Sequence, residues 1–173
     1  MPRLPSPPPR PQHNLTISGS RIHFFLDKFQ IIIYKYVYMK NLTRLFKLLS
    51  DETRVRMLML LGSRELCVCQ LMGIIGISQP LISRNLSLLS AAGLLDERRE
   101  GKLVFYSIAK DLPPATAEIL RILKRELKGD KRLRGDMRSM GDCAQFQKIT
   151  GKCDMKTFLA FMEKRKGKTE PGK

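Results

Sequence analysis

The sequence predicts a mainly α-helical fold with one small β-hairpin. Three observations carry this prediction: apolar residues recur at helical spacing in several short segments, one later segment has a polar face, and two charged extended runs follow that segment. Short helices that lead to a polar-faced helix and then to a basic hairpin make up the winged helix-turn-helix plan. We expect this unit to be dimeric, because its first and last helices present apolar faces that a small monomer would not cover.

The first three predicted helices precede the polar-faced one. In the first, apolar residues recur at i, i+3, i+4 and i+7: Leu42, Leu45, Phe46 and Leu49. Ser50 is placed to cap a second helix, whose first turn is acidic and which ends at Gly62. A third helix is expected from near Glu65 to a glycine stop at Gly73 or Gly76.

The fourth predicted helix separates an apolar face from a polar one. Ser78 is placed to cap it, Pro80 falls in the first turn where its missing N–H costs nothing, and Gly93 follows as a stop. The inner face carries Ile82, Leu86 and Leu89. The outward face is expected to carry Gln79, Ser83, Ser87 and Ser90, with Arg84 alongside.

Two extended runs after the fourth helix predict a β-hairpin. They flank Glu100 and Gly101, and the basic residues at the turn are Arg98, Arg99 and Lys102. A last amphipathic helix is expected over residues 113–128.

These elements predict one domain with two extensions. Residues 1–40 form an N-terminal extension that is proline-rich at its start and disordered or of uncertain structure, and Met39 is an alternative start of translation. Residues 41–128 form the DNA-binding and dimerisation domain. Residues 129–173 form a basic C-terminal extension that begins like a linker and contains a short helix over residues 155–166.

Charge and cysteine content narrow the class of protein. The chain has 32 Lys and Arg against 16 Asp and Glu, and its net charge of +16 favours a polyanionic partner such as nucleic acid. Four cysteines and a proline-rich N-terminus indicate a reducing cytoplasm rather than a secreted disulfide scaffold. The apolar stretch over residues 24–39 is interrupted by Asp27, Lys28 and Lys35, so we expect no membrane span.

The polar-faced helix and the hairpin carry the candidate DNA-binding residues. Short polar side chains at the start of a reading helix can reach base edges, and cations on a hairpin can neutralise phosphates. The candidates are Ser78, Gln79, Ser83, Arg84, Ser87, Arg98, Arg99 and Lys102. Ordinary solvated faces have a similar composition, but the order of these segments favours a DNA reader. The sequence shows no set of catalytic residues, so we do not expect an enzyme.

Residues 42–109 strongly resemble the ArsR family of small homodimeric winged-helix repressors. The strings that carry the resemblance are LFKLLSDETRVRMLMLL, ELCVCQL, SQPLISRNLSLLSAAGLL and REGKLVFYSI. ELCVCQL resembles the metalloid-binding segment of the arsenic-responsive members. The resemblance implies a cytoplasmic homodimer that binds inverted-repeat operator DNA and needs no cofactor. It also implies that arsenite or antimonite acts as inducer by binding Cys67 and Cys69, which releases the DNA.

One departure from this resemblance concerns the third ligand. In the best-known form of the motif a third cysteine follows the second by three positions, and Met72 occupies that position here. Trivalent arsenic or antimony prefers three thiolates, and a thioether is a weak donor. Three completions stay open: a two-thiolate site, a small thiol or water as third ligand, or recruitment of Cys143 or Cys153.

Helix geometry predicts a conflict between ligation and an intact third helix. Residues two apart point about 200° apart around a regular helix, so Cys67 and Cys69 would need local unwinding to close on one ion. Such a distortion would move the reading helix or change the spacing of the dimer.

Other interpretations use the same two cysteines. They could sense oxidation in a winged-helix repressor, or serve a small thiol oxidoreductase that would show no salt-sensitive DNA binding. At least one of them could also be a small buried apolar residue, as free cysteine often is.

Overall fold

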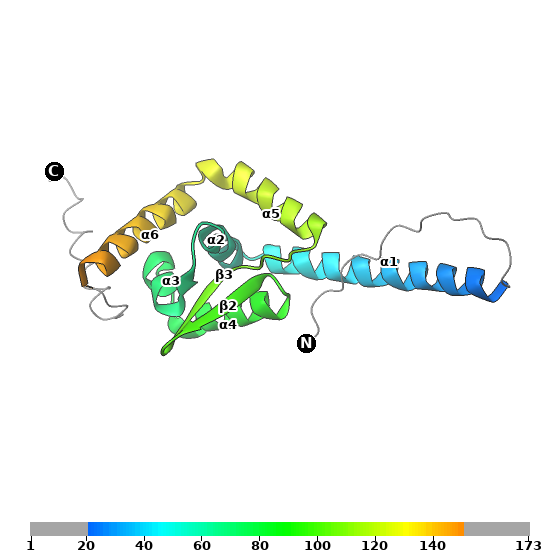
Figure 1. Ribbon diagram of the computed structural model, residues 1–173. Helices are drawn as coiled ribbons and strands as arrows, with labels where there is room; N and C mark the ends of the chain where they lie inside the picture. The colour runs from blue at the N-terminus through cyan, green and yellow to red at the C-terminus, as the bar shows by residue number, and fades with distance from the viewer. Residues whose placement is uncertain (1–20, 151–173) are drawn as a thin grey trace.

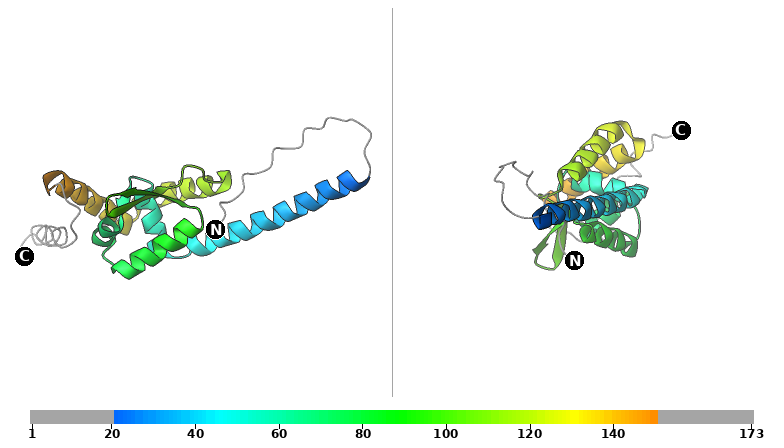
Figure 2. Two further views of the ribbon diagram at one scale, coloured as in Figure 1. Left: turned by 60° about the horizontal axis from the view of Figure 1, so that its bottom comes forward. Right: turned by 90° about the vertical axis from the view of Figure 1, so that its right-hand side faces the viewer.

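The computed structural model describes residues 21–150 of the chain (Figure 1). In chain order its elements are α1 (Arg21–Leu49), α2 (Glu52–Leu61), β1 (Leu66–Cys67), α3 (Val68–Ile75), α4 (Gln79–Ala91), β2 (Leu95–Glu100), β3 (Leu103–Ile108), α5 (Pro114–Glu126), the 3₁₀ turn η1 (Leu127–Gly129) and α6 (Lys131–Thr150). Helices α2 and α3 lie in the middle of the molecule, with α5 and α6 on one side and α4 and the hairpin on the other (Figures 1 and 2). The reading helix and the hairpin therefore share one side, as a winged helix-turn-helix requires.

Strands β2 and β3 form the predicted hairpin. Leu95 lies opposite Ile108 and Glu100 lies opposite Leu103, which leaves a two-residue turn at Gly101 and Lys102. Gly101 has φ of 58°, a left-handed conformation that glycine adopts without steric cost.

A third strand, β1, completes an antiparallel sheet of order β1-β3-β2. Leu66 lies opposite Tyr106 and Cys67 lies opposite Phe105. The prediction of helix from near Glu65 is wrong over these two residues, because pairing with the free edge of β3 keeps them extended. Helix α3 begins only at Val68.

The core lies between α2, α3, α4 and the sheet. The predicted inner stripe of α4 is confirmed, since Ile82, Leu86 and Leu89 are almost fully buried. Their partners from the surrounding elements are Met57, Leu58, Leu60, Leu66, Leu71 and Leu94.

The helix caps differ in detail from the prediction. Asp51 rather than Ser50 caps α2, because its Oδ1 accepts the backbone N–H of Arg54 at 3.0 Å. Helix α3 ends at Gly76, whose φ of 79° stops the helix in the left-handed conformation. Ser78 precedes α4 as predicted, with extended backbone but without a side-chain cap, and Pro80 lies in the first turn.

Helix α1 begins far earlier than the sequence indicates and continues through the predicted boundary at residue 40. Residues 21–40 are helical here, which differs from the predicted disordered or uncertain extension; residues 1–20 lie outside the described residues. Figure 2 shows α1 projecting well beyond the rest of the molecule. Among the described side chains of α1, Leu45 and Leu48 near its C-terminal end are buried in the core. None of the helices within residues 21–150 has the length and apolar content that crossing a membrane requires.

Helix α6 belongs to the folded domain, although the sequence suggested a linker there. It packs against α2 and α3, and its residues Leu133 and Cys143 are buried in the core. Asp136 is also buried and binds Arg56 of α2 through two hydrogen bonds of 2.7 Å. The many charges of this segment hid its apolar face from the sequence pattern. The helix predicted over residues 155–166 lies outside the described residues.

Candidate metal centre and nucleic-acid interface

Cys67 and Cys69 lie on either side of the start of α3. Cys67 ends β1 with an extended backbone (φ −90°, ψ 170°), and Cys69 is the second residue of the helix. Their Sγ atoms are 2.8 Å apart. Cys67 is 1% exposed, whereas Cys69 is half-buried and gives the pair an approach from solvent. The two sulfurs therefore form one soft donor pair at the junction of sheet and helix.

The premise of the predicted conflict between ligation and an intact α3 is wrong, because Cys67 lies outside the helix. That prediction placed both cysteines inside a regular helix, where side chains two apart diverge. The extended backbone of Cys67 turns its sulfur toward Cys69 instead. The start of α3 therefore does not hold the two sulfurs apart.

Gln70 holds this junction in place, and the sequence reasoning missed it. Its Oε1 accepts the backbone N–H of Cys67 at 2.8 Å, and the residue is 2% exposed. A glutamine at the third helical position that reaches back to the cap residue forms half of a capping box. The spacing of Gln70 three residues after Cys67 was the available signal, but it required knowing that the helix starts at Val68.

The described residues do not supply a closed metal site. No group of three or more His, Cys, Asp or Glu within residues 21–150 has an arrangement that could hold a metal ion. Cys143 is buried on α6 and does not join Cys67 and Cys69 in such a group. Met72 is half-buried on α3, and Cys153 lies outside the described residues.

Helix α4 presents Arg84 near the centre of its exposed face. Ser87, Leu81 and Leu88 are exposed beside it, and Gln79 is exposed at the N-terminal end. This face is rotated from the predicted one, because Ser83 and Ser90 are half-buried. Two of its hydroxyls are used within the protein: Ser87 Oγ donates to the Ser83 carbonyl at 2.9 Å, and Ser90 Oγ donates to Glu97 Oε1 at 2.8 Å.

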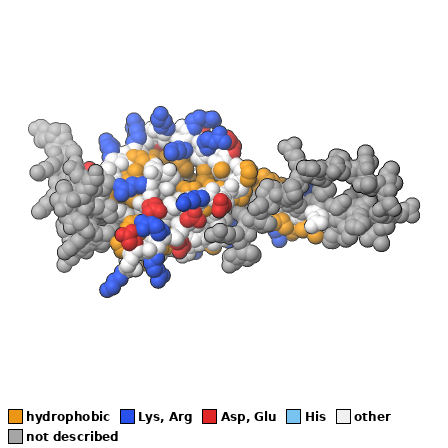
Figure 3. All heavy atoms as spheres, in the orientation of Figure 1, with side chains coloured by type: hydrophobic (Ala, Val, Ile, Leu, Met, Phe, Trp, Pro, Cys, Tyr) orange, Lys and Arg blue, Asp and Glu red, His pale blue; other side chains and the backbone are white. Residues whose placement is uncertain are grey.

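The basic residues of the hairpin fall into two kinds. Arg99 and Lys102 are exposed at or next to the turn, and no ion pair to either is found within the described residues. Arg98 instead forms ion pairs with Glu65 and Glu100. Its hydrogen bond to Glu65 has the largest effect on the pKa of its guanidinium, and together with the bond to Glu100 it raises that pKa above the usual range. Figure 3 shows Lys and Arg side chains projecting beyond the hairpin tip, with acidic and basic side chains mixed higher on its face. Arg99 and Lys102 are thus the better placed for phosphates.

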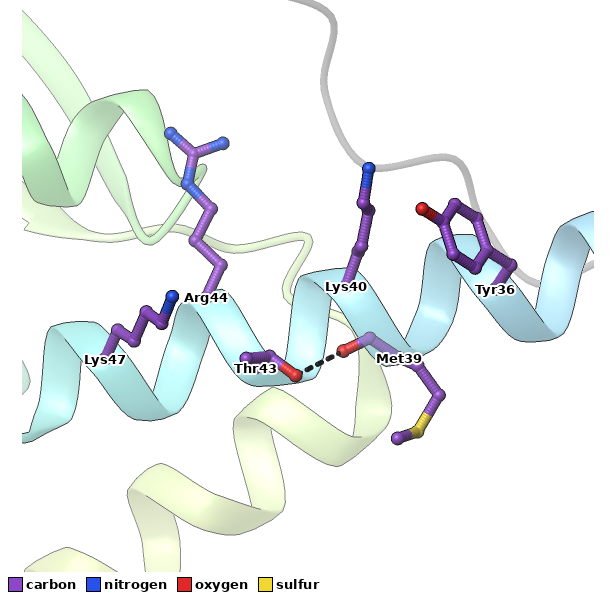
Figure 4. A pocket seen from close by; sticks show the side chains of 6 residues that line it. All are labelled: Tyr36, Met39, Lys40, Thr43, Arg44 and Lys47. Atoms are coloured by element: carbon purple, nitrogen blue, oxygen red, sulfur yellow. Dashed lines mark hydrogen bonds between the residues drawn. The ribbon is translucent and has the colours of Figure 1, made fainter.

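A shallow hollow of about 350 Å³ lies along α1, and none of the cysteines within residues 21–150 lines it (Figure 4). Tyr36, Lys40 and Arg44 point to the same side of the helix, and Lys40 Nζ lies 4.9 Å from the centre of the Tyr36 ring. The other lining residues are Met39, Thr43 and Lys47. None of them is a predicted site residue.

Comparison with known proteins assigns the family. Residues 51–97 match the family model described as bacterial regulatory protein, arsR family. Over 78 residues the chain is 47% identical to the arsenic resistance transcriptional regulator ArsR2 of Pseudomonas putida. This alignment covers 44% of this chain and 68% of that relative. The chain belongs to the ArsR family. Its ArsR-family relatives are transcriptional regulators rather than enzymes, and the arsenical resistance operon repressor of Escherichia coli is 46% identical over 78 residues, 44% of this chain and 67% of the relative.

Other relatives are named for resistance to a different metal, cadmium. The cadmium resistance regulatory protein CadC homolog of Staphylococcus aureus is 44% identical over 69 residues, covering 39% of this chain and 57% of that relative. Among solved structures, reduced HlyU from Vibrio cholerae aligns with a TM-score of 0.48 at 26% identity, covering 54% of this chain and 95% of that one. The homodimeric winged helix-turn-helix domain Mb0332 from Mycobacterium bovis aligns with a TM-score of 0.47 at 26% identity, covering 56% and 87%.

Proposed function

We propose that this ArsR-family regulator represses transcription by binding an inverted-repeat operator as a homodimer, and that it releases the operator when arsenite or antimonite binds Cys67 and Cys69. The observation that carries the proposal is the 2.8 Å separation of the two Sγ atoms at the start of α3, in the segment that leads directly into α4. Soft trivalent metalloids prefer such thiolate donors. Relatives with arsenic resistance in their names support the same inducer class.

The chemistry of binding fits two protein thiols. Arsenite reaches the site as neutral As(OH)₃. Each thiol gives its proton to one hydroxyl group of arsenic, which leaves as water. Two As–S bonds form, two As–O bonds break and two waters leave. We propose that hydroxide or a small thiol keeps the third position, because within residues 21–150 no third His, Cys, Asp or Glu joins the pair in a group that could hold a metal ion.

The DNA-binding surface follows from the shared side of α4 and the hairpin. Gln79 and Arg84 are exposed on α4 and can bond base edges, while Arg99 and Lys102 are placed to neutralise flanking phosphates. In a two-fold dimer the two reading helices face two half-sites, so the operator is expected to be an inverted repeat.

The proposed dimer interface includes the exposed stripe of α1. Four of its side chains, each more than half exposed, follow the alternating spacing of coiled-coil a and d positions: Ile32, Tyr36, Met39 and Phe46. Figure 3 shows hydrophobic side chains along this part of α1. An exposed apolar stripe of this length indicates a surface that a partner protein covers. Ile122 of α5 is also exposed and is a second candidate for the same interface.

The dimer is tested by sedimentation of Met39→Glu beside Gln30→Glu. Met39 lies on the stripe, whereas Gln30 is exposed on the same helix but off the stripe. We expect Met39→Glu to weaken the dimer about tenfold or more, since a carboxylate would be buried in the seam, and Gln30→Glu to leave it unchanged. Equal dimer affinity in both variants would contradict the role of α1.

The inducer is tested by titrating arsenite into the operator complex and following fluorescence anisotropy. We expect the wild type to release the operator, and Cys67→Ser and Cys69→Ser to retain it. Cys143→Ser is the matched control and should respond like the wild type. Undiminished operator binding by the wild type at excess arsenite and antimonite would refute the proposal, and release by cadmium alone would assign the other inducer named among the relatives.

The 2.8 Å separation also favours a second candidate, a thiol-redox repressor. A peroxide would take two electrons from the two thiols, which join as a disulfide, and would itself leave as two waters. Operator release by peroxide, reversal by dithiothreitol and no effect of arsenite would favour this function over the first.

A further inference from the structure

One row of side chains crosses all three strands of the sheet and ends at the cysteine pair. Arg98 of β2 lies opposite Phe105 of β3, and Phe105 lies opposite Cys67 of β1. Directly opposed residues of antiparallel strands point to the same face. The Arg98 guanidinium carbon lies 5.0 Å from the centre of the Phe105 ring, which is cation–π range.

Arg98 also links the start of β1 to the end of β2. Its Nε and Nη2 donate to Glu65 Oε2 at 3.0 and 2.8 Å, and its Nη1 donates to Glu100 Oε2 at 2.6 Å. Glu65 immediately precedes β1, and Glu100 ends β2 beside the turn. A single side chain thus ties the segment that carries Cys67 to the tip of the hairpin.

Ligand geometry requires the cysteines to move. Two sulfurs bound to one ion at about 2.3 Å, the zinc–thiolate distance, near the tetrahedral angle stand about 3.8 Å apart. The two Sγ atoms here are 2.8 Å apart, so ligation must separate them. Cys67 belongs to β1, a strand of two residues that pairs with β3, and it also caps α3. A movement of Cys67 would therefore act on β1 and on its pairing with β3.

We propose that Arg98 is a positioning residue that carries occupancy of the cysteine pair from β1 to the hairpin. This inference rests on the proposed function of Cys67 and Cys69. Exposed ion pairs of this kind contribute little to stability. The role of Arg98 is instead to make β1 and the hairpin move together. A shift of Cys67 then displaces the basic tip of the hairpin from the DNA.

The experiment compares Arg98→Gln with Arg99→Gln in the full chain. The readouts are the ratio of operator Kd with and without saturating arsenite, and the slope of operator affinity against salt. Coupling between two sites typically corresponds to a ratio of about 5 to 150. We expect Arg98→Gln to lower the wild-type ratio at least about threefold toward one, and to reduce the salt slope by less than Arg99→Gln does. Arg99→Gln should keep the ratio and reduce the salt slope by about one.

A second variant tests the same contact without changing Arg98, so that misfolding of Arg98→Gln cannot decide the result. Glu65→Gln removes the same link from the β1 side, and we expect it to lower the ratio as much as Arg98→Gln does. The double variant should show no further loss, because both changes break one contact.

The outcomes separate this inference from the proposed function. A wild type that keeps its operator in arsenite overturns both. A responsive wild type with an equal ratio in Arg98→Gln and Glu65→Gln overturns only the role of Arg98. A reduced salt slope in Arg98→Gln, equal to that of Arg99→Gln, also overturns it, since Arg98 would then be a phosphate contact.

Discussion

The backbone conformation of Cys67 controls the arrangement of both thiols. Because Cys67 is extended and pairs with β3, its Sγ turns toward the sulfur of Cys69 across the start of α3. Gln70 fixes this arrangement from the helix side by accepting the Cys67 N–H. The two sulfurs are therefore neighbours before any ligand arrives, and ligation has only to separate them from 2.8 Å to the ligand geometry.

We predict that Gln70→Ala destabilises the protein by about 1–3 kcal/mol. The change removes the acceptor of a buried backbone N–H and half of the cap of α3. Denaturant unfolding measures the free energy directly. The same experiment on Gln79→Ala is the control, because Gln79 is exposed on α4 and its loss should change the unfolding free energy by less than about 0.5 kcal/mol. Similar values for the two variants would show that the Gln70 bond contributes nothing.

At the level of elements, β1 and α4 flank α3 and give the cysteine pair two neighbours. Strand β1 joins the pair to the hairpin, and the turn at Gly76 joins α3 to α4. The sequence predicted transmission through α3 by unwinding. Under the proposed function the structure adds a second route, because β1 joins the cysteine pair to the hairpin.

The exposed face of α4 predicts two kinds of DNA contact. Arg84 should act partly through charge, while Leu81 is 50% exposed and can pack against a thymine methyl group. We expect Leu81→Ala to weaken operator binding by about 1 kcal/mol with an unchanged salt slope, and Arg84→Ala to weaken binding and lower the slope by about one. Anisotropy titrations at several salt concentrations measure both quantities. An unchanged affinity in Leu81→Ala would mean that this leucine does not touch the DNA.

At the scale of the whole molecule, the folded unit is larger than the winged domain predicted over residues 41–128. Helix α1 extends it on one side, and α6 closes it on the other by packing on α2 and α3. Arg56 donates two hydrogen bonds to Asp136, and these bonds raise the pKa of Arg56 above its usual value. Helix α6 thus covers the back of the helix that carries Cys69.

We predict that Asp136→Asn destabilises the protein by about 3 kcal/mol. It leaves Arg56 without its charge partner, and the cost lies at the lower end for buried pairs because Arg56 keeps some exposure. Thermal or denaturant unfolding measures it. Glu52→Gln is the matched control: it breaks the pair with Arg132, which also joins α2 to α6 but is exposed, and should cost less than about 1 kcal/mol. An equal loss of unfolding free energy in both variants would mean that the burial of Asp136 does not strengthen its pair with Arg56.

Much of the central fold was predictable because it depends on local patterns. The apolar spacing of α2 and α4, the glycine stop at Gly76 and the two runs of the hairpin are readable from neighbouring residues alone. The stripe of Ile82, Leu86 and Leu89 was correct because helical periodicity fixes which side chains share a face. The candidate DNA-binding residues on α4 were chosen by the same periodicity, and the structure centres the exposed face on Arg84 and leaves Ser83 half-buried.

The sequence by itself determined the order of helices, the hairpin, the basic charge and the identity of the two thiols, since each depends on residue type or local spacing. Tertiary structure decided how these parts meet. Pairing with β3 made Leu66 and Cys67 a strand and brought the thiols together, and packing on α3 made α6 part of the core. Both outcomes depend on contacts between residues far apart in the chain, and local spacing carries no record of such contacts.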